Sequence, residues 1–166
     1  MPQPRPPGGG FERSVLPTPA KFTVVAAAAE GGTELNAFDN AILKAGIGNL
    51  NLLRVSSILP PGAKQVDKLE IQPGSLVPTA FGTITGERPG EIISAAIAVG
   101  VSPDTYGVIM EFSGHCHKQE AEATARAMVE EAFAVRGLSL ERIIVKAVEH
   151  KVERCGCAFA GVALWY

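Results

Sequence analysis

The run from Leu52 to Leu59 constrains the fold more than any other stretch, because it reads as a β-strand that holds two adjacent serines. Its other residues are mostly apolar or β-branched, and a pair of prolines without backbone N–H groups ends it. Side chains alternate along a strand, so Ser56 and Ser57 are expected on opposite faces of a core sheet. At least one hydroxyl then needs a hydrogen-bond partner away from bulk water.

Two interpretations of this serine pair are open. In the structural one, which the dipeptide alone favours, each hydroxyl bonds to a neighbouring backbone group. In the reactive one, the Ser57 hydroxyl attacks the carbonyl carbon of Ser56 and turns the amide into an ester. β-Elimination then cuts the chain and leaves dehydroalanine, which hydrolyses to a pyruvoyl group. The new chain would begin with an electrophilic ketone.

Length and composition indicate one globular domain. The chain has 166 residues, of which 46% are hydrophobic and 19% charged, with a net charge of −2. These values argue against disorder and against a nucleic-acid surface, so a small molecule is the expected partner. Three cysteines cannot all pair with one another, and the N-terminus does not resemble a signal peptide. We therefore expect a cytoplasmic protein without a membrane partner, since no apolar run approaches the roughly 20 residues of a membrane span.

Residues 1–20 are expected to form a Pro/Gly-rich mobile arm, followed by a single domain over residues 21–166. The alternative for residues 11–16 is a tail that docks on a neighbouring subunit. Within the domain we expect an α+β fold whose helices cover sheets, and no internal repeat is evident. The apolar patterns predict strands over 21–29, 76–85, 91–99, 107–113, 143–152 and 157–165, and helices over 33–44 and 117–136, with a loop over 63–73.

Two carboxylates, those of Asp39 and Glu111, lie at positions that each allow two interpretations. Asp39 lies at the border of the apolar stripe of the first helix, where it either lines a pocket or is solvated. Glu111 shares a strand face with Ile109 and Ser113, whereas Val108 and its alternating neighbours take the other face. It either faces solvent or is buried among apolar side chains. Burial would raise the pKa of Glu111 and suit it to act as a general acid.

The segment from Gly46 to Asn51 approaches the serine run through two glycines, which permit close backbone contacts. It is not a phosphate loop, because it lacks the Gly-Lys-Ser/Thr ending and precedes a strand. The amide of Asn51 could donate to the Ser56 carbonyl oxygen while negative charge develops there. The competing interpretation is an ordinary turn or strand-edge asparagine.

Five further residues are of types that can ligate a soft metal. They are His115, Cys116, His117, Cys155 and Cys157. The spacing differs from the Cys-x-x-Cys of common zinc sites, and adjacent ligands on a strand point to opposite faces. We therefore expect no metal, and we expect the last two cysteines to be small buried residues. A metal-binding module is kept as an alternative.

Four segments carry a resemblance to a known family. They are residues 49–61, which contain the serine pair, residues 34–41 (ELNAFDNA), residues 110–114 (MEFSG) and residues 156–165 (GCAFAGVALW). Together they closely resemble the pyruvoyl-dependent arginine decarboxylases, and the resemblance covers the chain from about Lys21 to the end. It implies a four-layer αββα sandwich that assembles as a homotrimer, with active sites between subunits.

The resemblance also implies a chemistry. The bond between Ser56 and Ser57 would be cut autocatalytically into a β fragment (1–56) and an α fragment (57–166). A covalent pyruvoyl group from Ser57, with no PLP and no metal, would decarboxylate L-arginine to agmatine and carbon dioxide. Glu111 would protonate the α-carbon and Asp39 would pair with the guanidinium.

By the same resemblance, Gly48 would belong to the substrate site and Asn51 to the catalytic set. Two alternatives to the main interpretation remain open. One is the same pyruvoyl chemistry on another amino acid, since a carboxylate in a pocket could also receive an ammonium group. The other is an unprocessed, non-catalytic trimeric homologue.

Overall fold

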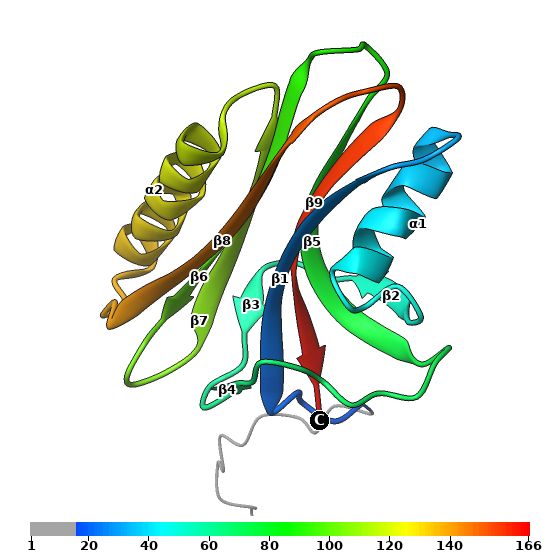
Figure 1. Cartoon of the computed structure of the whole chain (residues 1–166). Coiled ribbons are helices and arrows are strands. Elements are labelled where there is room, and N and C mark those ends of the chain that lie inside the picture. The colour runs from blue at the N-terminus through cyan, green and yellow to red at the C-terminus, as the bar shows by residue number, and fades with distance from the viewer. Residues whose placement is uncertain (1–15) are drawn as a thin grey trace, which may run out of the picture.

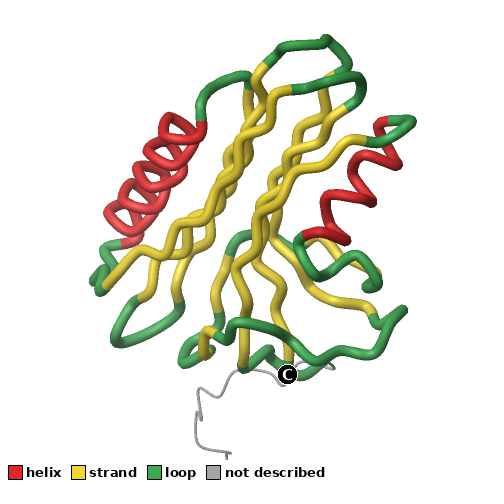
Figure 2. Tube along the Cα trace, viewed as in Figure 1, coloured by secondary structure: helices red, strands yellow, loops and turns green. Residues whose placement is uncertain are grey.

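Nine strands and two helices build residues 16–166, the part of the chain that this computed structural model describes (Figures 1 and 2). In chain order they are β1 (Lys21–Glu30), α1 (Glu34–Lys44), β2 (Asn51–Arg54), β3 (Ile58–Leu59), β4 (Lys64–Gln65), β5 (Leu76–Gly86), β6 (Ile92–Val101), β7 (Gly107–Gly114), α2 (Lys118–Arg136), β8 (Arg142–Lys151) and β9 (Gly156–Trp165). The α+β expectation is confirmed. The predicted arm and docking tail lie almost wholly outside the described residues.

The strands form two sheets that face each other. Sheet A has the order β2-β5-β9-β1-β4, and sheet B has the order β3-β7-β6-β8. In Figure 1, α1 lies on the outer side of sheet A and α2 on the outer side of sheet B. Strand β1 is antiparallel to β9 over its whole length and parallel to the short β4. It therefore occupies an interior position in its sheet.

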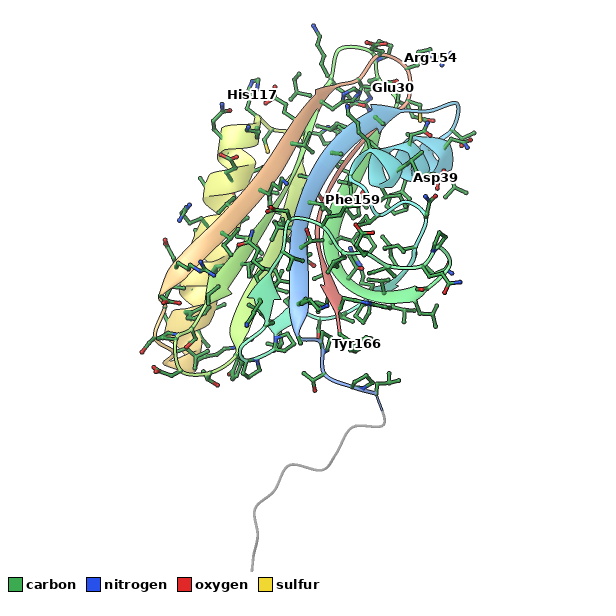
Figure 3. All side chains as sticks on the ribbon, turned by 60° about the horizontal axis from the view of Figure 1, so that its bottom comes forward. Glu30, Asp39, His117, Arg154, Phe159 and Tyr166 are labelled. Atoms are coloured by element: carbon green, nitrogen blue, oxygen red, sulfur yellow. The ribbon has the colours of Figure 1, made fainter. Side chains whose placement is uncertain are left out.

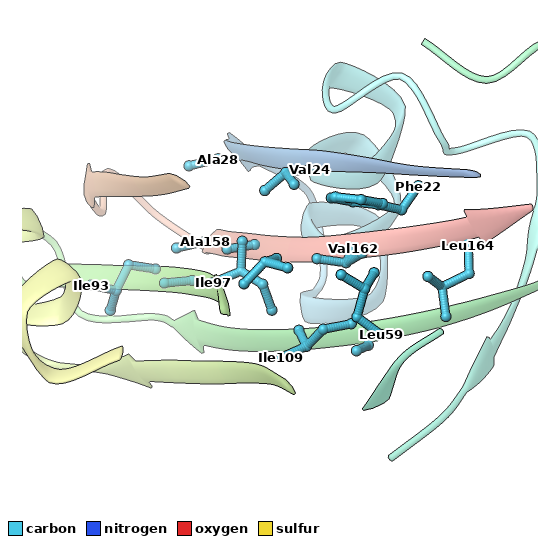
Figure 4. Close-up of a cluster of buried hydrophobic side chains, with 14 of the residues drawn as sticks. Phe22, Val24, Ala28, Leu59, Ile93, Ile97, Ile109, Ala158, Val162 and Leu164 are labelled. Atoms are coloured by element: carbon cyan, nitrogen blue, oxygen red, sulfur yellow. The ribbon is translucent and has the colours of Figure 1, made fainter. Parts of the chain in front are cut away.

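Strict alternation of side chains separates the apolar residues into three clusters. On β6, Ile93 and Ile97 point between the sheets, whereas Ala96 and Ala98 point toward α2. On β9, Val162 points between the sheets and Phe159 toward α1. Figure 4 shows the cluster between the sheets. Strands such as β6 and β9 are apolar on both sides because both of their faces are covered.

The helix boundaries follow from their capping residues. The Thr33 hydroxyl accepts a hydrogen bond from the Asn36 backbone N–H at 3.2 Å and so starts α1, as the sequence predicts. Helix α2 ends at Gly137, whose φ of 62° lies in the left-handed region that glycine enters without strain. No helix among residues 16–166 is long and apolar enough to cross a membrane.

The single strand predicted for the serine run is wrong. The run is divided into β2, which pairs with β5 in sheet A, and β3, which pairs with β7 in sheet B. The Val55 N–H still bonds to the Thr79 carbonyl at 3.2 Å, but the Ser57 carbonyl already accepts from Ile109 at 2.8 Å. The serines thus lie where the chain passes from one sheet to the other. Ser56 is exposed and Ser57 is half-buried.

Candidate active site

The carbonyl of Ser56 is held by the backbone. Its oxygen accepts a hydrogen bond from the Ile58 N–H at 3.0 Å, which closes a three-residue turn around Ser57. No described non-glycine residue has a positive φ, so this is the common inverse form of the turn. A donor on this oxygen would stabilise negative charge that develops during attack on the carbonyl carbon. Sequence reasoning missed this donor, because a backbone N–H carries no residue-type signal.

Ser57 directly precedes β3, whose partner strand β7 carries Glu111. Antiparallel pairing of β3 with β7 sets Ile58 opposite Val108, and the hydrogen bond from Ile109 extends this register to Ser57. Residues directly opposite each other in an antiparallel pair point to the same side. Glu111 is then the diagonal neighbour of Ser57, at a spacing of roughly 7–8 Å. The Glu111 side chain is directed toward β5 of sheet A.

Glu111 is a partly buried carboxyl, the second of its two predicted alternatives. Its Oε2 atom is buried and has no hydrogen-bond partner among the described residues. Across the gap lies Gly82 of β5, and a Cβ built there would be 3.2 Å from the Glu111 Cβ. Burial raises the pKa of Glu111, while the positive charge of Arg54 opposes the rise. A raised pKa suits a carboxyl to act as a general acid.

Arg54 is a charged residue that the sequence did not single out. Its Cζ atom lies 4.2 Å from the centroid of the Phe81 ring, and its Nη2 atom donates to the Phe81 carbonyl oxygen. Phe81 in turn packs against Phe38 and Phe159, at centroid distances of 6.3 and 5.3 Å. The guanidinium is therefore fixed at the edge of β5 although Arg54 is exposed.

A cavity of about 310 Å³ lies beside Ser56. It is lined by residues 16–19, Val55, Ser56, Ile58, Pro60, Pro78, Leu164 and Tyr166. Most of these side chains are apolar. There is thus open space next to the bond between the two serines.

The other predicted site residues do not converge on Glu111 within this chain. Asp39 is exposed on α1, which packs on the outer side of sheet A (Figure 3). Gly48 packs closely against the end of α1, since a Cβ there would be 2.6 Å from the Leu43 nitrogen. The Asn51 Nδ2 atom donates to the Gly74 carbonyl at 2.7 Å. The roles expected for these three residues stay predictions.

The histidines and cysteines have partners other than a metal. His115 lies 3.4 Å from Glu91 and His117 lies 3.1 Å from Glu149, in each case from Nδ1 to a carboxylate oxygen. Cys155 and Cys157 are buried, as expected, and burial raises the pKa of both thiols. No group of three His, Cys, Asp or Glu residues between positions 16 and 166 could hold a metal ion.

Glu30 closes the end of the sheets that is remote from Ser57. Its carboxylate accepts the backbone N–H groups of Glu153, Arg154 and Cys155 at 2.9–3.0 Å, and it lies 2.6 Å from His150 Nε2. Partial burial acts to raise the pKa of Glu30, but the Glu153 N–H, His150 and the other two N–H groups outweigh it and lower the pKa to about 2. Figure 3 shows Glu30 and Arg154 together at this end, with Tyr166 at the other.

Comparison with known proteins places the chain in one family. The model of the family described as "Pyruvoyl-dependent arginine decarboxylase (PvlArgDC)" matches residues 21–166. A protein of that name from Methanocaldococcus jannaschii is 53% identical over 150 residues, which cover 89% of this chain and 91% of the relative. One from Methanococcus maripaludis is 46% identical over 155 residues, covering 92% and 94%, and one from Pyrococcus abyssi is 47% identical over 152 residues, covering 89% and 96%. The chain therefore belongs to the pyruvoyl-dependent arginine decarboxylase family.

Proposed function

We propose that this protein cuts its own Ser56–Ser57 bond and then decarboxylates L-arginine to agmatine and carbon dioxide. One relationship carries the proposal: the Ser57 carbonyl accepts from Ile109, two residues before the partly buried Glu111 on β7, while the Ile58 N–H holds the carbonyl that Ser57 would attack. The substrate follows from the name that the relatives bear.

The self-cleavage proceeds through groups that the chain already positions. The Ser57 Oγ bonds to the Ser56 carbonyl carbon, the C–N bond breaks, and the amine stays on Ser57 as an ester forms. Loss of the Ser57 α-proton and cleavage of the Cβ–O bond then release Ser56 as a carboxylate. Addition of water and departure of ammonia convert the resulting dehydroalanine into the pyruvoyl group. The Ile58 N–H stabilises the oxyanion of the first step.

The residues around Ser57 fit a pyruvoyl group at this position. The group supplies an electron-withdrawing ketone for decarboxylation. Burial raises the pKa of Glu111 and so favours its protonated form, and Glu111 delivers this proton to the substrate α-carbon after carbon dioxide leaves. Its Oε2 atom, which lacks a partner among the described residues, is free to face that carbon. Gly82 leaves the space in which the carboxyl lies.

We further propose that the two helices and two sheets form a four-layer αββα sandwich and that three chains assemble, with active sites between them. Asp39 supports this arrangement, because it is exposed on the outer layer and cannot reach Glu111 on the inner face of its own chain. Supplied by a neighbouring subunit, its carboxylate would pair with the substrate guanidinium through two parallel hydrogen bonds. Gly48 and Asn51 would join this site from the same region of the chain.

Intact-mass measurement of the purified protein tests the proposal. We expect two fragments, 1–56 and 57–166, the larger of them beginning with a pyruvoyl group and therefore blocked to N-terminal sequencing. The Ser57→Ala variant should remain one chain without decarboxylase activity, whereas Ser139→Ala, on an exposed surface residue, should be processed normally. A single full-length chain in the parent protein would instead identify a non-catalytic homologue. Activity on another amino acid but not on arginine would refute the substrate.

A further inference from the structure

Arg54 lies at the edge of sheet A, two residues before Ser56. It is the last residue of β2, and beyond it the edge of β5 has no further strand among the described residues. The guanidinium covers this edge through its donation to the Phe81 carbonyl and its stacking on the Phe81 ring. Two contacts to one residue fix the position of a side chain that is otherwise exposed.

This anchoring point is adjacent to Glu111. Phe81 is followed by Gly82, whose inward side lies against Glu111, since a Cβ on Gly82 would be 3.2 Å from the Glu111 Cβ and 3.5 Å from its Cγ. Side chains alternate along β5, so Phe81 faces α1 while Gly82 faces sheet B. Arg54 therefore contacts Phe81 at the edge of β5, and Glu111 lies against the next residue, Gly82, on the face toward sheet B.

The positive charge of Arg54 opposes the rise in the pKa of Glu111. Lys146 of β8 also faces the gap between the sheets, in the same row as Glu111 and Ile97, and its Nζ atom donates to the Val24 carbonyl at 3.2 Å. Strands β3, β5 and β6, which surround Glu111, carry no titratable side chain. Strand β9 contributes Cys157, which belongs to the cluster under α1. Helix α2 covers the opposite face of β7, where Glu131 and Arg136 lie around Met110.

We propose that Arg54 is a positioning residue for decarboxylation: its guanidinium, fixed on Phe81 at the edge of β5, holds a positive charge next to the place from which Glu111 donates its proton. The inference rests on the proposed role of Glu111 as the proton donor. A nearby cation favours the ionised carboxylate, whereas burial favours the protonated form. Arg54 thus keeps a buried acid able to release its proton, since a carboxyl that burial alone controlled would be a weaker acid.

The test measures the protonation of the Glu111 carboxyl directly and does not require cleavage of the chain. In the uncut Ser57→Ala background, infrared titration follows the protonated carboxyl band that disappears when Glu111→Gln is added. Adding Arg54→Gln should move the midpoint of this band to higher pH. Arg54→Lys, which retains the charge, should leave the midpoint closer to the parent value. Arg126→Gln, an exposed change on α2, should not move it.

A second measurement connects the titration to turnover. In processed enzyme, kcat should fall on the alkaline side as Glu111 loses its proton, and Arg54→Gln should shift that fall to higher pH. An unmoved midpoint in Arg54→Gln, together with an inactive Glu111→Gln enzyme, would overturn the inference and leave the proposed function intact. Full activity of Glu111→Gln would instead refute the proton donor itself. A purely structural role for Arg54 would lower kcat without shifting either profile, and that result would also overturn the inference.

Discussion

Glu111 and Gly82 face each other across the gap between the two sheets, so closely that a Cβ on Gly82 would lie 3.2 Å from the Glu111 Cβ. We expect Gly82→Val to displace the Glu111 carboxyl and to lower kcat by about 10²-fold, the typical effect of a misplacement of about 1 Å. Steady-state kinetics on correctly processed protein measures this loss. Gly32→Ala is the control, because a Cβ at Gly32 meets nothing within 4 Å. Parent-like turnover of Gly82→Val would show that the fit at Glu111 is not needed.

Replacement of Glu111 by glutamine separates proton donation from folding. The amide has the same shape but no acidic proton, so turnover of arginine should fall by about 10²- to 10⁴-fold, the usual contribution of a positioned general acid. Intact mass should show that the variant is still cut between Ser56 and Ser57. Turnover near the parent rate would mean that water or another side chain supplies the proton.

Asp39→Asn tests recognition of the guanidinium. Loss of a charge-assisted, two-point contact should lower kcat/KM for arginine by about 10- to 100-fold. Self-cleavage should be unaffected, because Asp39 lies on the outer side of sheet A. Glu130→Gln on α2 removes an exposed carboxylate elsewhere and serves as the control. Equal losses of cleavage and activity in Asp39→Asn would make this residue structural.

The lowered pKa of Glu30 predicts how the stability of the folded protein depends on pH. The pKa of Glu30 is about 2 in the folded protein against an ordinary value of 4.5, so the folded state favours the carboxylate. Its contribution is complete above about pH 4.5 and is lost as pH falls toward 2. Glu30→Gln should therefore lower the melting temperature at pH 7, and its difference from the parent protein should shrink through this range.

The control for Glu30 is Glu70→Gln. Glu70 pairs with Lys68 at 3.2 Å on an exposed surface, and such pairs contribute little to stability. The two variants can be compared by thermal unfolding at several pH values. A destabilisation of Glu30→Gln that persisted unchanged at pH 2 would show that the effect is steric and not electrostatic.

The sequence predicted the fold where the signal is local. The periodicity of α1, its cap at Thr33 and the alternation around Glu111 all depend on neighbours within a few residues, and each is confirmed. The sequence did not predict that the serine run is divided at Val55. The division depends on pairing with distant strands, β5 for the first half and β7 for the second. The residues before and after this division are equally apolar, so the local sequence does not mark it.

The candidate site divides in the same way. Residue type and position were enough to single out Ser57 and Glu111, but their roles were predicted from the family resemblance. Arg54 and the Ile58 N–H were not singled out, since their importance comes from contacts made by the folded chain, on Phe81 and on the Ser56 carbonyl. In our proposal Asp39 acts in the active site of a neighbouring subunit, and a single chain cannot display that contact.

The interior position of β1 bears on the order of folding and cleavage. Under the proposed cleavage β1 would belong to one polypeptide, while both strands that flank it, β9 and β4, would belong to the other. Neither polypeptide could complete sheet A alone, so we expect the intact chain to fold before it is cut. Refolding of the mature protomer then becomes a bimolecular reaction whose success depends on concentration, whereas the uncut chain assembles the same sheet in a unimolecular one.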